Sequence, residues 1–182
     1  QISANRRRGF CDVIIGNIAK MLNSANPLTL SQAQQCIIAQ MQSHTTLLLL
    51  TGITDWAPQL LRDTSLLCDG EYINVSLELA KHIRQIAVVN SLEAIQLLRD
   101  RLASLDARTL FLDRLEILFT PVLQLDVLRL LLELNRNVRT VAVWPGAYQD
   151  NQLTYATPDH PEYRAYLDPE IVFPVTILAL RR

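Results

Sequence analysis

The sequence has few cysteines and few histidines. Cys11, Cys36 and Cys68 are the only cysteines among 182 residues. They are odd in number and far apart, and no C-x-x-C pair occurs, which argues against a disulfide framework and against a zinc site. The histidines show no metal-ligand spacing either and are scattered: His44, His82 and His160. We therefore expect reduced cysteines that behave as small apolar residues of a cytosolic protein.

An excess of one charge and long apolar runs are also missing. The formal net charge is −1 at pH 7, so no overall positive field favours nucleic acid. No apolar run approaches the roughly 20 residues that a membrane span needs. Arg6 to Arg8 form a basic cluster, but Asp12, Asn17 and Lys20 interrupt the segment after it, unlike a signal peptide. The sequence predicts a soluble, cytoplasmic protein with no membrane partner.

The most informative stretch is the apolar run from Thr46 to Thr51, which leads into Gly52 and then a helical pattern. Such a run predicts a strand buried on both faces, then a loop and a helix. Phosphate-binding loops have this local order and the pattern G-x-x-x-x-G-K-[ST]. Its glycines let the backbone close around the phosphates, its lysine reaches the β and γ oxygens, and its hydroxyl holds magnesium.

This chain keeps the spacing of that pattern and loses its chemistry. The corresponding residues are Gly52, Ile53, Thr54, Asp55, Trp56, Ala57, Pro58 and Gln59. Ala57 resists the positive φ of the second glycine, and Pro58 offers neither the lysine's cation nor an N–H. Gln59 replaces the hydroxyl residue. Asp55 is predicted to cap the next helix, so its carboxylate would occupy the phosphate position. We expect weak phosphate binding at most. The alternative is an ordinary strand, turn and helix without nucleotide ancestry.

Strands and helices alternate along the rest of the chain. Further strands are predicted at 72–75, 109–113, 138–144, 153–155 and 171–178, and Pro174 gives the last one an edge position or a bulge. Helices are predicted at 10–22, at 31–42 with Ser31 as cap, from Trp56 to about Asp69, and from Ser76, Ser91 and Thr120-Pro121. Residues 148–151 are predicted as a turn and 158–164 as a loop. The alternation predicts an α/β fold with parallel strand pairing.

Several spaced blocks together resemble a known family. They are YINVSLEL at 72–79, LFLDRLEILF at 110–119, VAVWPG at 141–146, LTY at 153–155 and HPEYR at 160–164. From about residue 45 to residue 176 the chain resembles the BrxF family, the small P-loop proteins of type-three BREX bacteriophage-defence systems. The resemblance implies a three-layer, additional-strand (AAA/RecA-like) P-loop NTPase domain over 45–182. That domain would have a mostly parallel five-stranded sheet, with two leading helices in 1–44 packing on it.

The resemblance also implies a site and partners. Asp113 matches the Walker B carboxylate that holds magnesium, and Glu116 could polarise an attacking water. Arg114 could instead pair with either acid, and Asp113 could merely cap the next turn. Partners would be other BREX-type defence subunits, with DNA reached through the complex, and a homo-oligomer is compatible with this. Because the loop is degenerate, we expect a binding or regulatory subunit without a resident cofactor. Mg-ATP, with magnesium at Asp113, is expected only if the loop works.

Two other functions stay open. An active ATPase could take its missing cation from Arg136 or Arg139 across a subunit interface. A nucleic-acid-binding module could use Arg6 to Arg8 together with Arg99 and Arg101, although the near-neutral charge speaks against a large footprint.

Two further features have a structural and a functional interpretation. Trp144 follows the fourth strand, where a phosphate sensor would stand, and its bulk suits a filled pocket. The stiff, polar loop from His160 to Arg164 is either a surface turn or a small polar site that binds a partner.

Overall fold

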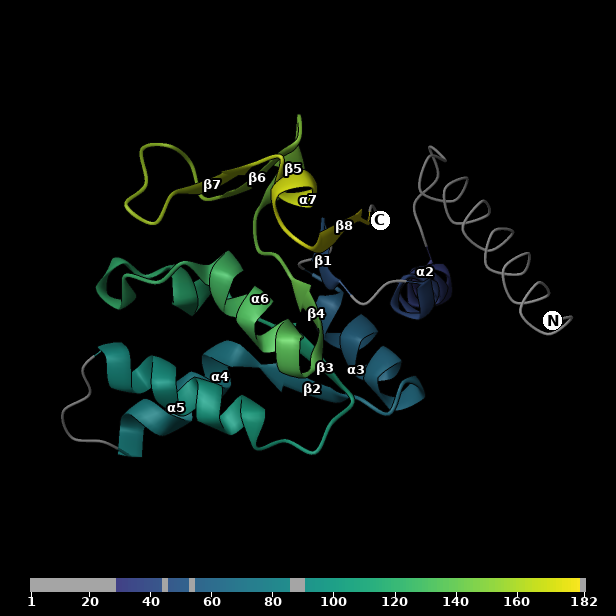
Figure 1. The fold of residues 1–182 in the computed structure, drawn as a ribbon, viewed down its shortest axis with the longest axis horizontal. Helices are drawn as coiled ribbons and strands as arrows, with labels where there is room; N and C mark the ends of the chain where they lie inside the picture. The colour runs from purple at the N-terminus through teal and green to yellow at the C-terminus, as the bar shows by residue number, and fades with distance from the viewer. Residues whose placement is uncertain (1–28, 44–45, 53–54, 86–90, 181–182) are drawn as a thin grey trace, which may run out of the picture.

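A parallel sheet of five strands forms the centre of the computed structural model, which describes residues 29–43, 46–52, 55–85 and 91–180. The strands are β1 (Leu47–Thr51), β2 (Glu71–Asn74), β3 (Thr109–Asp113), β4 (Arg139–Val143) and β8 (Val175–Ala179). Their order is β2-β3-β4-β1-β8, and every pairing is parallel (Figure 1). The α/β fold and the five-stranded parallel sheet are therefore confirmed.

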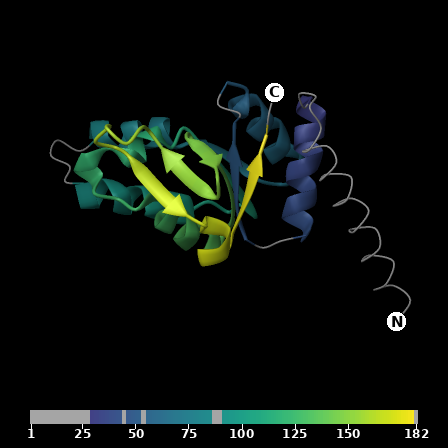
Figure 2. The ribbon, with the colours of Figure 1, turned by 90° about the horizontal axis from the view of Figure 1, so that it is seen from above.

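Helices cover both faces of this sheet (Figures 1 and 2). They are α2 (Leu30–Ser43), α3 (Ala57–Leu67), α4 (Val75–Gln85), α5 (Ser91–Ala103) and α6 (Val127–Asn137). Successive strand side chains point to opposite faces, so the leucines of β1 divide between two cores. Leu47 and Leu49 pack with α4, α5 and α6, whereas Leu48 and Leu50 pack with α2 and α3. β1 is thus buried on both faces, as its unbroken apolar run predicts.

A second, antiparallel sheet lies above the main one, and the sequence predicts only part of it. It contains β5 (Ala147–Gln149), β6 (Gln152–Tyr155) and β7 (Arg164–Leu167), and Figure 2 shows it face on. Only β6 was predicted. The turn predicted at 148–151 is confined to Asp150 and Asn151, which both have a positive φ (48° and 57°) and close a two-residue hairpin. The loop predicted at 158–164 ends at Arg164, where β7 begins.

Two helix caps differ from the prediction. Thr29, not Ser31, caps α2: its hydroxyl accepts the Gln32 N–H (3.3 Å), and the Gln32 side chain accepts the Thr29 N–H (2.9 Å), which is a capping box. Asn74, not Ser76, caps α4, because its side chain accepts a backbone N–H of the first turn at 2.9 Å. The helices begin one residue before the predicted caps, so both serines lie inside the first turn.

The helix predicted from Thr120-Pro121 is also corrected. After the 3₁₀ turn η1 (Glu116–Phe119), Pro121 starts only a second 3₁₀ turn, η2 (Pro121–Leu123). Gln124 then adopts a left-handed conformation (φ 46°), which ends it. The α-helix α6 starts after Asp126, whose carboxylate accepts the Arg129 N–H at 3.1 Å.

The last predicted strand is shorter than expected. Residues 171 and 172 belong to a short helix, α7 (Pro169–Val172), and Pro174 lies just before β8 instead of within it. β8 is an edge strand, as Pro174 predicts. The helix predicted at 10–22 lies outside the described residues. None of the described helices is long and apolar enough to cross a membrane.

Candidate functional site

The loop at the carboxyl end of β1 opens on a glycine that the backbone requires. Gly52 has a φ of +80°, a conformation that L side chains rarely adopt. A β-carbon at this position would also collide with the carbonyl oxygen of Leu180, just after β8. The Leu180 N–H donates to the Thr51 carbonyl at 2.9 Å, so the chain end of β8 is fixed against this turn. Packing of the two strands is thus enough to explain Gly52.

The rest of the loop leads directly into α3. Ile53 and Thr54 lie outside the described residues. Trp56 occupies the N-cap position, and its carbonyl accepts the Leu60 N–H at 3.1 Å. Asp55 is therefore not the cap that the sequence predicts: it lies one residue too early for its carboxylate to reach the first amides, and α3 has no side-chain cap. The helix nevertheless starts at Ala57, where the phosphate-loop pattern places its second glycine.

The start of α3 offers little to a phosphate. Ala57 is fully buried as the first helical residue, so it contributes packing and does not take up the positive φ of a glycine. Pro58, in the lysine position, occupies the second helical position and supplies no N–H and no cation. Gln59 and Asp55 are exposed. Among the described loop residues, 52 and 55–59, there is no positively charged side chain.

Asp113 ends β3 and is 97% buried, with both carboxylate oxygens engaged. Oδ1 accepts the Arg114 N–H at 2.8 Å, and Oδ2 accepts the Tyr72 hydroxyl at 3.1 Å. Burial and the adjacent carboxylate raise the pKa of the Tyr72 hydroxyl, and Arg62, which lies 4.8 Å from the Tyr72 ring centre, opposes this shift. The geometry matches a strand-end carboxylate that stabilises the following turn, and a magnesium ion would have to compete with these donors.

Glu116 is a weak partner of Arg114. The Arg114 guanidinium and the Glu116 carboxylate are 4.0 Å apart, and both are about half exposed. Arg114 has a left-handed φ of 57°, and its carbonyl accepts both the N–H (3.2 Å) and the hydroxyl (2.7 Å) of Ser76. The turn after β3 is therefore held by its backbone and does not depend on Glu116. Within the described ranges, no group of three His, Cys, Asp or Glu residues is placed to hold a metal ion.

The arginines considered for other functions lie away from this loop or are paired. Arg139 begins β4, and Arg136 is in the last turn of α6. Because β1 and β4 are parallel, both arginines lie at the end of the sheet opposite to Gly52. Arg99 pairs with Glu133 at 2.8 Å and Arg101 with Glu78 at 3.1 Å. Arg6 to Arg8 lie outside the described residues.

Trp144 fixes the antiparallel sheet to the main sheet. Its indole N–H donates to the Thr154 carbonyl at 2.7 Å, and the side chain is fully buried. The ring meets Phe119 edge-on at 5.2 Å and Tyr166 at 5.8 Å, and Phe119 stacks on Tyr155 at 3.9 Å. Trp144 therefore fills the core beneath β6 and β7, on the sheet face that α3 does not cover.

The loop from His160 to Arg164 is a turn between β6 and β7 whose polar groups bond to one another and to β6. The Glu162 N–H donates to His160 Nδ1 at 3.2 Å, and the Tyr155 hydroxyl donates to the Glu162 carboxylate at 3.3 Å. The Arg164 guanidinium donates to the carbonyl of Tyr163 at 2.8 Å. These contacts agree with a surface turn, one of its two interpretations.

Tyr72 and Arg62 are the residues at this site that the sequence did not single out. Both lie beside Asp113 only because β2 pairs with β3 in a register that sets Asn74 opposite Asp113, while α3 packs on one face of these strands. The sequence does contain a signal, an aromatic residue in the short strand β2 and a carboxylate at the end of β3. The strand order and register are needed to show that the two residues meet.

Comparison of the chain with models of known protein families, with curated proteins and with solved structures gave no match.

Proposed function

We propose that this chain is a nucleotide-site-degenerate P-loop NTPase-like subunit with a binding or regulatory role in a BREX-type bacteriophage-defence complex of the cytoplasm. One observation carries the proposal: a strand, a glycine turn and a helix follow one another at phosphate-loop spacing, yet Pro58 occupies the lysine position at the second residue of α3. The resemblance of the spaced blocks to the BrxF family supplies the biological setting.

The strand order supports the same proposal. β4 lies between β1, which precedes the loop, and β3, which ends in Asp113. An additional-strand core has one strand between its phosphate-loop strand and its carboxylate strand, so this order agrees with that class. It also agrees with other α/β folds in which ligands sit beyond the carboxyl ends of the strands.

Isothermal titration with Mg-ATP tests whether the loop has lost its function. We expect no binding at micromolar concentrations, because the loop lacks a cation and Asp113 is already bound to Tyr72 and Arg114. Micromolar binding that disappears in Asp113→Ala would overturn the proposal and favour a working ATPase.

Restoring the motif distinguishes a degenerate phosphate loop from an ordinary strand, turn and helix. The triple variant Ala57→Gly, Pro58→Lys, Gln59→Thr rebuilds the pattern in a loop of unchanged length. We expect it to gain measurable ATP binding, while Gln59→Thr alone does not. A folded triple variant without any gain would favour the ordinary alternative.

Co-purification tests the complex. A tagged chain produced together with the genes that flank its own is expected to retain other defence subunits, and retention should not change in Pro58→Ala. A chain that purifies alone under these conditions would contradict the binding role.

A further inference from the structure

The two edges of the main sheet are treated differently. At β8 the Ile177 N–H donates to the Glu170 carboxylate of α7 at 2.8 Å, and the Val175 N–H donates to the Phe173 carbonyl at 2.8 Å. Glu170 also accepts the Tyr148 hydroxyl at 3.2 Å. Edge strands are templates for pairing with other chains unless something covers them. Here α7 and the segment after it close the β8 edge.

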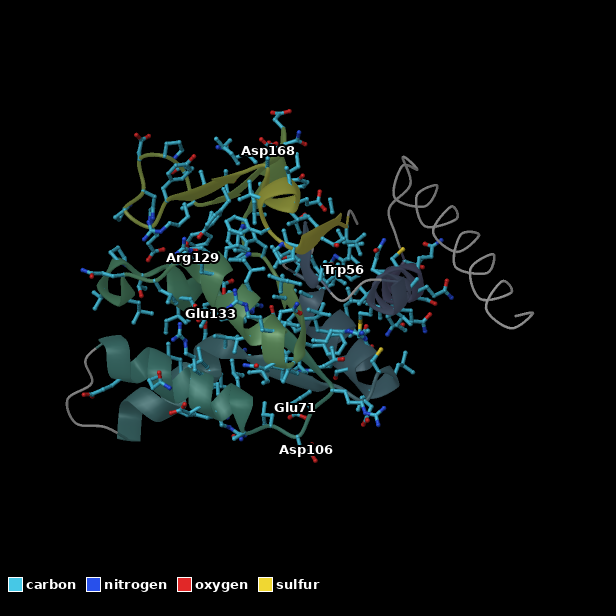
Figure 3. All side chains as sticks on the ribbon, in the orientation of Figure 1. Trp56, Glu71, Asp106, Arg129, Glu133 and Asp168 are labelled. Atoms are coloured by element: carbon cyan, nitrogen blue, oxygen red, sulfur yellow. The ribbon has the colours of Figure 1, made fainter. Side chains whose placement is uncertain are left out.

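The β2 edge has no such cover among the described residues. β2 pairs with β3 on one side only, and no described hydrogen bond reaches the backbone of residues 71–73 on the other side. A groove of about 310 Å³ runs along this edge, between α3 on one sheet face and α4 and α5 on the other. In Figure 3, Glu71 marks the start of β2 and Asp168 marks the start of α7, and the two residues lie on opposite sides of the molecule.

The groove carries more positive than negative charge. It is lined by the cations Arg62, Lys81 and Arg101 and by the carboxylates Glu71 and Glu78. Glu78 pairs with two of the cations, with Lys81 at 3.4 Å and Arg101 at 3.1 Å, so one positive charge of these three side chains stays uncompensated. Arg62 lies over the Tyr72 ring and has no carboxylate within 4 Å among the described residues.

An apolar contact adjoins these charges. Leu77, in the first turn of α4, lines the groove and is 54% exposed. A strand that paired with β2 would direct alternate side chains to the two sheet faces. One set would meet Arg62, and the other would meet Leu77 and Lys81.

We propose that the β2 edge is a docking site for an extended segment of a partner protein with alternating acidic and apolar side chains. The segment adds a strand to the sheet: backbone hydrogen bonds supply affinity, and carboxylates opposite Arg62 with apolar side chains opposite Leu77 supply specificity. A nucleic acid strand fits less well, because a sugar–phosphate backbone lacks the alternating N–H and C=O groups that pair with a strand edge. The inference stands on β2 alone, whether or not residues 52–59 bind a nucleotide.

Fluorescence anisotropy with synthetic peptides tests this docking site. The probe is a fluorescein-labelled peptide with the sequence Glu-Val-Glu-Val-Glu-Val-Glu and blocked ends, titrated with the full chain at low salt. We expect saturable binding that weakens about fivefold in Arg62→Ala, the loss of one partly exposed charge contact, and stays unchanged in Arg136→Ala. A peptide with lysine for glutamate, and one with N-methylated backbone amides, should not bind.

Folding and competing occupants are checked in the same series. If Arg62→Ala has an altered circular dichroism spectrum, the exposed substitution Lys81→Glu replaces it and should weaken binding too. No binding of the acidic peptide, equal binding of the N-methylated peptide, or undiminished binding to the folded variants overturns the proposal. So does displacement of the peptide by a single-stranded oligo-dT, which would assign the groove to nucleic acid. If the chain forms a dimer and Lys81→Glu dissociates it, the edge would instead be assigned to a second copy.

Discussion

Gly52 illustrates how a single residue can satisfy two different requirements. The phosphate-loop pattern needs a glycine at this position so that the backbone can close around phosphates. The structure needs one because φ is +80° and the Leu180 carbonyl lies against the turn. The second requirement persists when the first is lost, so the presence of Gly52 is not evidence that a nucleotide binds.

We expect Gly52→Ala to destabilise the protein by on the order of 2 kcal/mol, since it combines a strained positive φ with a backbone collision. The free energy of unfolding in urea measures the effect, and Gln59→Ala, an exposed change a few residues later, serves as control. Equal stabilities of the two variants would contradict the close packing of Gly52 on Leu180.

The hydrogen bond between Tyr72 and Asp113 gives a second residue-scale prediction. Tyr72→Phe leaves one oxygen of a buried carboxylate without its donor, and we expect a loss of about 1 to 3 kcal/mol of unfolding free energy. Asp113→Asn should cost a similar amount, because its amide group cannot accept from both donors. In the double variant the two losses should not add, since both remove the same contact. Full additivity in urea unfolding would show that the two residues act separately.

At the scale of single elements, the caps decide where helices begin. Thr120-Pro121 has the expected chemistry of a helix start, yet Asp126 caps α6 and Tyr166 donates to the same carboxylate at 3.0 Å. The choice depends on a contact with β7, forty residues later, and is invisible in the local sequence. Asn74 and Thr29 each cap their helix two residues before the predicted serine, but through local contacts with the first turn of α4 and of α2.

We expect Asp126→Ala to lower the unfolding free energy by about 1 to 2 kcal/mol, because α6 loses its cap. Thr120→Ala should have a smaller effect, since the Thr120 hydroxyl only donates to the Ile117 carbonyl of a 3₁₀ turn. Urea unfolding of the two variants checks the order. A larger loss for Thr120→Ala would mean that α6 starts where the sequence predicts it.

The closure of β8 by α7 is an element-scale feature with a testable consequence. Glu170→Ala frees the Ile177 N–H at the strand edge, so we expect the variant to self-associate as its concentration rises. Sedimentation velocity of the variant is compared with that of Asp159→Ala, which removes an exposed acid from the 158–164 loop. If both variants sediment like the parent chain, Glu170 does not protect the edge.

For the whole molecule, residues buried on both sides were the predictable ones. Leu47 to Leu50 and the strand ending in Asp113 are unbroken apolar runs, and their burial follows from composition alone. The sequence does not predict β5 and β7 of the antiparallel sheet because these strands are three or four residues long and half exposed, and the β5–β6 hairpin depends on Asp150 and Asn151 taking a positive φ. At the site, spacing predicted the loop and the position of Asp113, but only strand register brings Tyr72 to that carboxylate.

Four tyrosines donate to carboxylates across the molecule: Tyr72, Tyr148, Tyr155 and Tyr166. Burial, followed by the neighbouring carboxylate, raises the pKa of each hydroxyl above its ordinary value of 10.0. The unfolded chain therefore loses these hydroxyl protons first as pH rises. The four hydrogen bonds contribute fully to stability below about pH 10, and their contribution is lost as the pH rises through the raised pKa values of the folded state.

We accordingly expect the urea midpoint to stay level to about pH 10 and to fall beyond it, because folding raises the pKa of these hydroxyls and deprotonation therefore favours the unfolded chain. Tyr166→Phe should start from a lower midpoint at neutral pH and show a shallower alkaline decline. A midpoint that rises above this pH would contradict the contribution of the tyrosines.

The contrast between a sealed flank at β8 and an open one at β2 limits how copies of this chain could associate through the main sheet. Propagation into a filament requires that every copy both give and receive a strand. A chain that can receive at only one flank accepts a single guest and then stops. Among the described residues, edge-to-edge pairing of two main sheets is therefore open only at β2, and such an assembly ends with two copies.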